Sequence, residues 1–344
     1  MTWIPPLRLA IDGAALVANW RALARLSGAA ACGAAVKANG YGLGAREVVA
    51  RLSTAGCRDF FVATWGEALA LADADVAIAV LHGARAEDMA LAGLPGVRPV
   101  LNTVDQVRRW RDAGVGECHV MVDTGMNRLG ISVADVAAGL LDGLRIDVLM
   151  SHLACADDDD PLNARQRAAF AALAGRTSAR RMSLANSAAI ALGSDYAFDL
   201  TRPGLALYGG VPRAELSDAI RPVAHPQAQI LQRRRVLAGD TVGYNAIWTA
   251  PADTDVAIVN LGYADGYRRG FSGTGSARIG DAMLPLLGRV SMDLTAIDVS
   301  AAPELGEGDW LEIAYDLPTA SAASGVSQYE LLTGLGQRFD RMWR

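Results

Sequence analysis

The chain has 344 residues, of which 51% are hydrophobic and 20% are charged, and its formal net charge is −5. This composition supports a large folded core and excludes a disordered chain, and the length predicts two domains or one large barrel with an appendage. The chain has no basic patch for nucleic acid and no apolar run near the roughly 20 residues that span a bilayer, so neither partner is expected.

The N-terminus and the scattered cysteines and histidines predict a cytoplasmic protein without a metal centre. Met1 to Pro6 contains no basic segment followed by an apolar stretch, so no secretory signal is predicted. The cysteines show no close pairing and predict buried small side chains rather than disulfides. The histidines lack the spacing of metal ligands. These residues are Cys32, Cys57, Cys118 and Cys155, and His82, His119, His152 and His225.

The first informative segment is the apolar run that leads into Lys37 and the glycine-rich turn of Asn39 to Gly42. It predicts a buried strand that places the Lys37 amine at its tip. A desolvated amine loses its proton more easily, and a neutral amine can form a Schiff base with a carbonyl substrate or with pyridoxal phosphate. A surface lysine at a strand end is the alternative interpretation of this segment alone.

Between residues 30 and 210, short apolar runs alternate with helix-like stretches such as Ala45 to Ala55. Seven runs end at Lys37, Thr64, His82, Asn102, Asp123, His152 and Asn186, and an eighth is predicted at Leu205 to Tyr208. Eight such units predict a (β/α)8 TIM barrel, because strands buried on both faces are continuously apolar. An open doubly wound sheet is the rival, but no Gly-x-Gly-x-x-Gly follows an early strand. The active site of a barrel lies at the C-terminal strand ends, where Lys37, Asp123, His152 and Asn186 are predicted to converge.

After Gly210 the pattern changes to alternating apolar and polar residues with turn signals, which predicts a C-terminal mostly-β domain. The prolines around Pro212 to Pro222 mark the junction. We therefore predict an α/β barrel domain over residues 1–218 and a β-rich domain over residues 219–344. The first strand-like run, Leu7 to Ile11, could belong to either domain.

Several separated motifs, in this order, resemble those of the alanine racemase family. The motifs are Ala35 to Gly42, Asp123 to Gly130, Ser151-His152, Asn186-Ser187, Arg202 to Gly204, Gly262 to Gly266, Gly288 to Asp293 and Tyr329-Glu330. The resemblance covers nearly the whole chain. It implies an enzyme that uses pyridoxal 5'-phosphate to interconvert L- and D-alanine, supplies D-alanine for peptidoglycan, and forms a homodimer whose β-rich domain completes the partner subunit's active site.

The resemblance implies two catalytic bases, Lys37 and Tyr263. Racemisation removes a proton from one face of Cα and returns one to the other face, so two groups on opposite faces solve the geometry. A phenol of pKa about 10 needs nearby positive charge to act as a phenolate. Without the resemblance, Tyr263 would be read as a turn tyrosine between Gly262 and Gly266.

The resemblance also implies the residues that hold the cofactor. Arg202 would face the pyridine nitrogen and leave it unprotonated, because an arginine does not surrender its proton. Ser187 would follow the seventh strand as a phosphate ligand, and it also suits a helix N-cap. The full implied set is Lys37, Tyr41, His152, Asn186, Ser187, Arg202, Gly204, Leu205 and Tyr329.

For the substrate, the resemblance implies Arg128, Met292 and Asp293 as binding residues. Arg128 would steady the cofactor's phenolic oxygen and the substrate carboxylate, and Met292 would offer a backbone amide. The chain departs from a common family pattern at Met121, where many members carry a carbamylated lysine that orients this arginine. A thioether carries no charge, so a bound anion or another side chain must orient Arg128.

Three alternatives to an alanine racemase remain at this stage. A carrier of pyridoxal phosphate would not need the motifs at Gly262 to Gly266 and Gly288 to Asp293. A related decarboxylase of diamino acids would have a cysteine-containing motif late in its β-domain, and no cysteine follows Cys155. A racemase of another small amino acid such as serine differs by one hydroxyl group, which a small pocket rejects weakly.

Overall fold

The computed structural model describes residues 3–344, which form two compact units. One unit consists of Leu16–Arg221, and the other combines the residues up to Ala15 with Pro222–Arg344. The junction at Pro222 lies close to the predicted boundary between residues 218 and 219.

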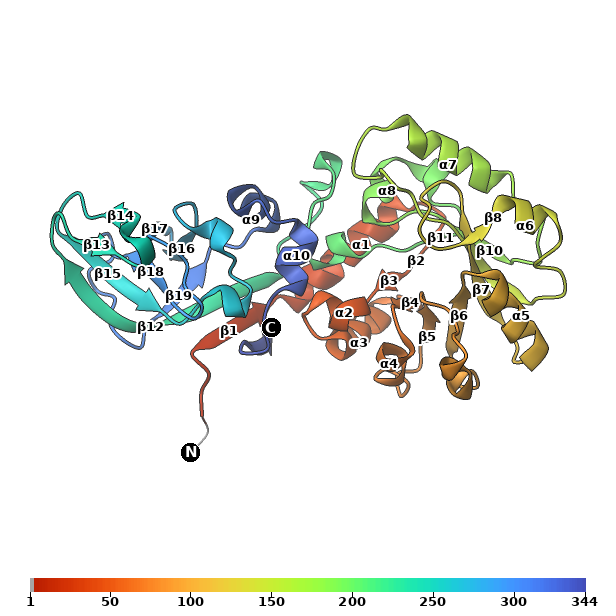
Figure 1. Cartoon of the computed structure of the whole chain (residues 1–344), viewed down its shortest axis with the longest axis horizontal. Coiled ribbons are helices and arrows are strands. Elements are labelled where there is room, and N and C mark those ends of the chain that lie inside the picture. The colour runs from red at the N-terminus through yellow and green to blue at the C-terminus, as the bar shows by residue number, and fades with distance from the viewer. Residues whose placement is uncertain (1–2) are drawn as a thin grey trace. The chain divides into compact units, whose positions relative to one another are not determined.

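The unit of residues 16–221 is a barrel of parallel strands with helices on its outside (Figure 1). Its strands are β2 (Ala31–Cys32), β3 (Ala34–Ala35), β4 (Asp59–Val62), β5 (Ala77–Val80), β6 (Val97–Leu101), β7 (Cys118–Asp123), β8 (Ile131–Ser132), β9 (Ile146–Met150), β10 (Arg181–Ser183) and β11 (Leu200–Thr201). Its helices are α1, which begins outside the unit (Gly13–Leu26), α2 (Lys37–Tyr41), α3 (Ala45–Ala55), α4 (Trp65–Leu69), α5 (Val104–Ala113), α6 (Val133–Ala137), α7 (Pro161–Ala171) and α8 (Ser187–Ala191).

The barrel closes through backbone hydrogen bonds at β11. Parallel pairing runs without a break from β3 through β4, β5, β6, β7 and β9 to β10. The Asp199 amide then donates to the Met182 carbonyl at 3.0 Å, and β11 pairs with β2. With β2 and β3 counted as one interrupted strand, eight strands form the ring, as the sequence predicts.

One predicted strand is wrong. Leu205–Tyr208 forms a buried 3-10 helix, and β11 (Leu200–Thr201) is the eighth strand instead. Both structures bury a short apolar run, so the hydrophobic pattern does not distinguish them. The backbone of Gly204 to Tyr208 consequently curls over the strand ends.

The second unit is a sheet that closes through the pairing of β12 with β15 and is antiparallel except where β1 pairs with β20 (Figure 1). Its strands are β1 (Leu7–Ile11), β12 (Ala224–Val236), β13 (Thr241–Val242), β14 (Trp248–Thr249), β15 (Thr254–Val259), β16 (Ser276–Ile279), β17 (Ala282–Leu287), β18 (Thr295–Asp298), β19 (Trp310–Ile313) and β20 (Asp340–Trp343), and its helices are α9 (Leu317–Ser324) and α10 (Gln328–Thr333).

Strand β12 has 13 residues and is long enough to pair with different strands along its two halves. Its first half pairs with β1 and β19, and its second half, beyond a register shift after Ile230, pairs with β15. Residues in the first half of β12 alternate between buried and half-buried, as expected for a sheet with one face on the core and one face toward solvent. The run Leu7–Ile11, left open by the sequence, pairs here with β12 and β20.

Candidate functional site

Lys37 lies two residues after β3, at the C-terminal ends of the barrel strands, and a left-handed turn follows it. Four consecutive residues, Ala38 to Tyr41, have φ between 53° and 63°. One of them is glycine and one is asparagine, which tolerates this region, but the left-handed region costs Ala38 and Tyr41 roughly 1–2 kcal/mol each. Strain of this kind persists only where the surroundings hold it, and it gathers at functional sites.

Glu67 holds this turn, although the sequence analysis did not select it. Its Oε1 accepts a hydrogen bond from the Ala38 amide at 2.6 Å, and its Oε2 accepts one from the Ala63 amide at 2.7 Å. Glu67 also forms a capping box with Thr64 at the start of α4. The Thr-x-x-Glu spacing was therefore a usable signal for the helix start, but the sequence did not reveal that the same carboxylate reaches the lysine turn.

Three cationic side chains gather at this mouth. The pKa of Lys37 is lowered by burial and by the positive charges of Arg128 and Arg202, and Glu67 only partly offsets these effects. A lowered lysine pKa increases the fraction of neutral amine, which is the nucleophilic form. The surplus of positive charge also favours anionic ligands such as a phosphate or a carboxylate.

Arg202 is buried, and among residues 3–344 it has no carboxylate partner. Its Nη1 donates to Ser183 Oγ at 2.5 Å and its Nη2 to the Ser151 carbonyl at 2.7 Å. Burial lowers the pKa of Arg202 to about 10, which leaves the guanidinium charged at neutral pH. No acidic side chain in the described part of the chain neutralises this charge, so the guanidinium is available to a ligand that carries lone pairs.

His152 follows β9 and is neutral. Burial, reinforced by the charges of Arg202, Arg128 and Lys37, lowers the pKa of His152 to about 3. The residue therefore presents an uncharged ring beside three cations, which suits contact with another flat ring better than binding of an anion.

Tyr41, Ser187 and Gly204 form a cradle at the ends of β3, β10 and β11. A Cβ on Gly204 would lie 2.2 Å from the Tyr41 hydroxyl, so only glycine permits this approach. Ser187 Oγ accepts hydrogen bonds from the amides of Gly204 at 2.9 Å and Ala206 at 3.1 Å. Ser187 is not the N-cap of α8, because that position belongs to Asn186, whose Oδ1 accepts from the Ala189 amide. Leu205 follows Gly204 in the curled backbone.

Arg128 lies in the loop after β7, and Asp123 shapes that loop. Asp123 Oδ1 accepts hydrogen bonds from the amides of residues 125, 126 and 127 at 2.8–3.2 Å. Within residues 3–344, the Arg128 guanidinium has no hydrogen bond or ion pair. The half-buried Met121 supplies no charge to it, as the sequence indicated.

The remaining predicted residues lie in the second unit, where Tyr263 and Met292 come together. The amide of Tyr263 donates to the Ser291 carbonyl and the amide of Ala264 to the Met292 carbonyl, both at 3.0 Å. A Cβ on Gly262 would lie 2.2 Å from that Met292 carbonyl oxygen, which explains the glycine. The motifs Gly262 to Gly266 and Gly288 to Asp293 are thus two sides of one structure.

Two arginines contact the turn of residues 262–266. Arg269 lies over the Tyr263 ring in a cation–π contact, with its guanidinium carbon 5.0 Å from the ring centroid. Arg338 bridges the buried Asp265 and Asp293, and neither Arg338 nor Asp265 was predicted. Tyr329, the last predicted residue, lies on α10 and is about one-third exposed.

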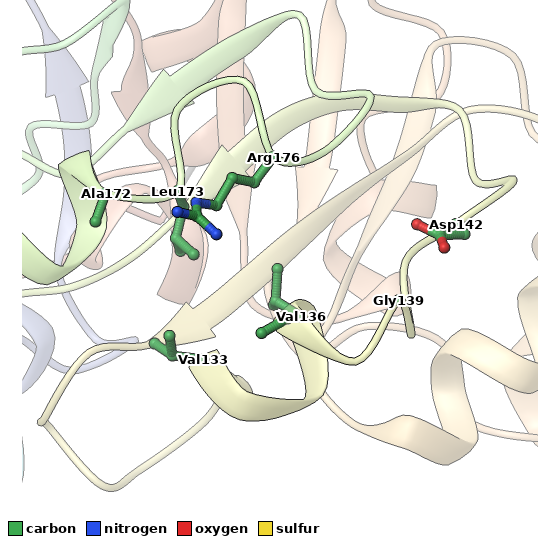
Figure 2. Close-up of a pocket in the computed structure, with 8 residues that line it drawn as sticks. Val133, Val136, Gly139, Asp142, Ala172, Leu173 and Arg176 are labelled. Carbon is green, nitrogen blue, oxygen red and sulfur yellow. The ribbon is translucent and has the colours of Figure 1, made fainter.

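A pocket elsewhere on the barrel contains none of these residues. It has a volume of about 410 Å³ between α6 and α7, and Figure 2 shows Val133, Val136 and Leu173 beside it with Arg176 and Asp142. In the part of the chain that the structure describes, no cluster of three metal-binding side chains occurs. No helix among residues 3–344 is long and apolar enough to cross a membrane.

Comparisons with known proteins agree with this geometry. The profile "Alanine racemase, N-terminal domain" matches residues 11–212, and "Alanine racemase, C-terminal domain" matches residues 223–343. Alanine racemase from Acidiphilium cryptum is 41% identical over 97% of this chain and 98% of its own, and that from Rhodospirillum rubrum is 43% identical over 97% and 95%.

A solved structure extends the comparison to three dimensions. Alanine racemase from Bartonella henselae, with covalently bound pyridoxal phosphate, superimposes with a TM-score of 0.90 at 34% identity, covering 99% of this chain and all of that one. Both family profiles and the full-length relatives lead to the same assignment. The chain therefore belongs to the alanine racemase family, whose members are pyridoxal-phosphate-dependent isomerases.

Proposed function

We propose that this protein interconverts L- and D-alanine with pyridoxal 5'-phosphate, using Lys37 and Tyr263 as its two bases. The observation that carries the proposal is the cluster of Lys37, Arg128 and Arg202 around a neutral His152 at the barrel mouth. This cluster offers one nucleophilic amine and two guanidinium groups to a ligand with a carbonyl and several anionic groups.

The cradle and the buried arginine fit pyridoxal phosphate. Ser187, Gly204 and Leu205 lie after the seventh and eighth strands, where barrels usually bind phosphate, and the missing Cβ of Gly204 leaves room beside the hydroxyl of Tyr41 from the first strand's loop. Asn186 fixes the start of α8 beside them. Arg202, held by serine and backbone oxygens rather than by a carboxylate, suits a neutral ring nitrogen. His152 would lie against the ring.

We assign different roles in racemisation to the residues of the site. Lys37 would hold the cofactor at rest and would be released as a free amine when the amino group of the substrate takes its place; the cofactor would then supply the electron withdrawal that makes the Cα proton removable. The Lys37 amine moves a proton at one face of Cα, and the Tyr263 phenol moves one at the other. Arg128 and the Met292 amide hold the carboxylate of the substrate, Asp293 supports the Met292 segment, and Tyr329 adds a hydroxyl to the phosphate.

The division of bases between two units leads us to propose a homodimer. Tyr263, Met292, Asp293 and Tyr329 of one subunit would complete the barrel site of its partner; the residues up to Ala15, predicted as part of a barrel over residues 1–218, belong to the β-rich unit that continues from Pro222. Diluting the protein until the subunits separate should abolish turnover in parallel with dissociation. Full activity in the separated subunit would contradict the shared site. We also propose a cytoplasmic enzyme that supplies D-alanine for peptidoglycan.

The decisive experiment combines a spectrum with an isotope assay. The purified protein should show a yellow absorbance band that borohydride abolishes, and it should convert L-alanine to D-alanine with incorporation of deuterium at Cα in heavy water. The band without exchange of alanine would contradict the proposal and favour a carrier. Running serine in the same assay measures the second candidate substrate, because one hydroxyl group separates it from alanine.

A further inference from the structure

A fully buried glutamine links the two loops that carry Arg128 and His152. Gln166 lies on α7 and has no exposed surface. Its Oε1 accepts a hydrogen bond from the Ala154 amide at 2.9 Å, and its Nε2 donates to the His152 carbonyl at 3.0 Å. Both polar atoms of the side chain thus hold the loop after β9.

The same amide nitrogen also reaches the loop after β7. Gln166 Nε2 lies 3.5 Å from Thr124 Oγ1, and its Cγ lies 3.6 Å from the position of a Cβ on Gly125. Thr124 Oγ1 in turn shares a hydrogen bond of 2.8 Å with Ser151 Oγ. Gln166 and Thr124 therefore connect two loops that no regular hydrogen-bond ladder joins beyond the end of the strands.

The network continues to the buried guanidinium. The Ser151 carbonyl accepts from Arg202 Nη2 at 2.7 Å, so one chain of contacts runs from Gln166 through Thr124 and Ser151 to Arg202. Asp123 organises the three residues before Arg128 through their amides, but it belongs to the same loop and cannot fix that loop against the rest of the mouth. Gln166 supplies a connection from outside it.

We infer that Gln166 is the positioning residue that sets the Arg128 loop against His152 and Arg202, acting through Thr124 and Ser151. The inference rests on the proposed function for Arg128. It accounts for how the loop is held when Met121 offers no charge and Arg128 has no partner of its own among residues 3–344. A guanidinium displaced by about 1 Å binds a carboxylate poorly, so a loosened loop should weaken substrate binding more than proton transfer.

The test compares Gln166→Leu with a matched control on the same helix. Asn163 is also buried, and its Nδ2 donates to the carbonyls of Cys155 and Asp158, both at 2.9 Å. Asn163→Leu thus removes an equally buried amide from the loop after β9 without touching the loop after β7. Thr124→Val is the milder second variant, because it removes one hydroxyl group and keeps the shape of the side chain.

In the holoenzyme, Gln166→Leu and Thr124→Val should each raise KM for alanine roughly tenfold and change kcat roughly threefold or less. This pattern is expected when a contact that holds the substrate equally in the ground state and the transition state is lost. The double variant should cost no more than the larger single effect, since both act through one network. Asn163→Leu should lower the melting temperature with KM unchanged. Equal KM shifts in all variants, or a lowered melting temperature alone in Gln166→Leu, would overturn the inference.

Hydrogen exchange provides a readout that does not depend on turnover. The backbone amides of residues 124–130 should exchange faster in Gln166→Leu and Thr124→Val than in the wild type, and at the wild-type rate in Asn163→Leu. Unchanged exchange in both network variants would refute the positioning role. If the wild-type protein fails to racemise alanine, the proposed function fails, while this exchange measurement still decides whether Gln166 holds the loop.

Should Gln166→Leu fail to fold, Thr124→Val carries the comparison alone. It keeps both hydrogen bonds of Gln166 to the loop after β9 and removes only the links to Ser151 and to Gln166 itself. A KM and an exchange rate equal to those of the wild type in this variant would reject the connection between the loops.

Discussion

Arg338 donates a hydrogen bond from Nε to Oδ1 of the fully buried Asp265 at 2.6 Å. The same guanidinium donates from Nη1 to Asp293 at 2.7 Å, and the other oxygen of Asp265 accepts from the Gly262 amide at 3.0 Å. One arginine therefore joins the turn of Tyr263 to the segment of Met292, the two parts of the β-rich unit to which we assign substrate chemistry.

Replacing Arg338 by methionine should destabilise the protein by about 2 kcal/mol. Breaking a buried ion pair costs about 3–5 kcal/mol, and the half-exposed position of Arg338 reduces that figure through solvent screening. Urea unfolding measures the change. Arg235→Met is the control, because Arg235 pairs with the exposed Asp253 at 3.3 Å and more distantly with Asp255 at 3.7 Å, and its loss should cost much less than that of Arg338. Equal losses of unfolding free energy in the two variants would show that the burial of Asp265 is not compensated by its ion pair with Arg338.

Tyr263→Phe removes one phenolic oxygen and should reduce racemisation by roughly 10²–10⁴-fold, the usual contribution of a general acid or base. The absorbance of the bound cofactor should be unchanged. Tyr267→Phe is the matched control directly after the same motif, because burial raises the pKa of Tyr267 and keeps that phenol neutral. Turnover by Tyr263→Phe at the wild-type rate would eliminate Tyr263 as a base.

Gly204→Ala should weaken the binding of pyridoxal phosphate by about tenfold, equivalent to about 1.4 kcal/mol. The added Cβ would lie 2.2 Å from the Tyr41 hydroxyl and 3.4 Å from the Ala35 Cβ, so Tyr41, which stacks on Tyr208, must move. Titration of the cofactor-free protein with pyridoxal phosphate measures the affinity. Gly93→Ala, where a Cβ meets no atom within 4 Å, should leave it unchanged. Wild-type affinity in Gly204→Ala would place the phosphate elsewhere.

Acid should destabilise the protein through His119, which lies inside the barrel. Burial lowers the pKa of His119, and the charges around it come from Arg98, Arg181, Asp147 and Asp59. An unfolded histidine titrates near pH 6.5, so below that pH unfolding takes up a proton that the folded state does not hold. The free energy of unfolding therefore falls as the pH drops below about 6.5, by about 1.4 kcal/mol per pH unit for this residue, and the loss stops at the lowered pKa of the folded state.

His119→Asn removes this titration and should make the pH dependence of stability shallower between about pH 6.5 and the lowered folded pKa. Urea unfolding at several pH values measures both slopes. His152, whose pKa is also lowered, titrates with the same sign in both proteins and cancels in the difference. Parallel curves for the wild type and His119→Asn would contradict the prediction.

The sequence predicted the barrel because its strands are buried on both faces and recur with helices between them. It misassigned Leu205–Tyr208, since four buried apolar residues read the same in a strand and in a 3-10 helix. The sequence did not predict the left-handed turn after Lys37 either. Asn39 tolerates that conformation, but Ala38 and Tyr41 have no local preference for it, and Glu67 from α4 stabilises it across the fold.

By itself, the sequence determined the family, the two kinds of domain and the residue types of the site. The periodicity of hydrophobic residues, the turn residues and the order of the motifs are local features of the chain, so they can be recognised without the fold. Only the tertiary structure decided which groups share a site and in what charge state. The neutral His152, the acid-free Arg202 and the connection from Gln166 to the Arg128 loop arise from contacts between residues far apart in sequence. Burial and distance set those properties, and neither quantity can be read from the order of residues.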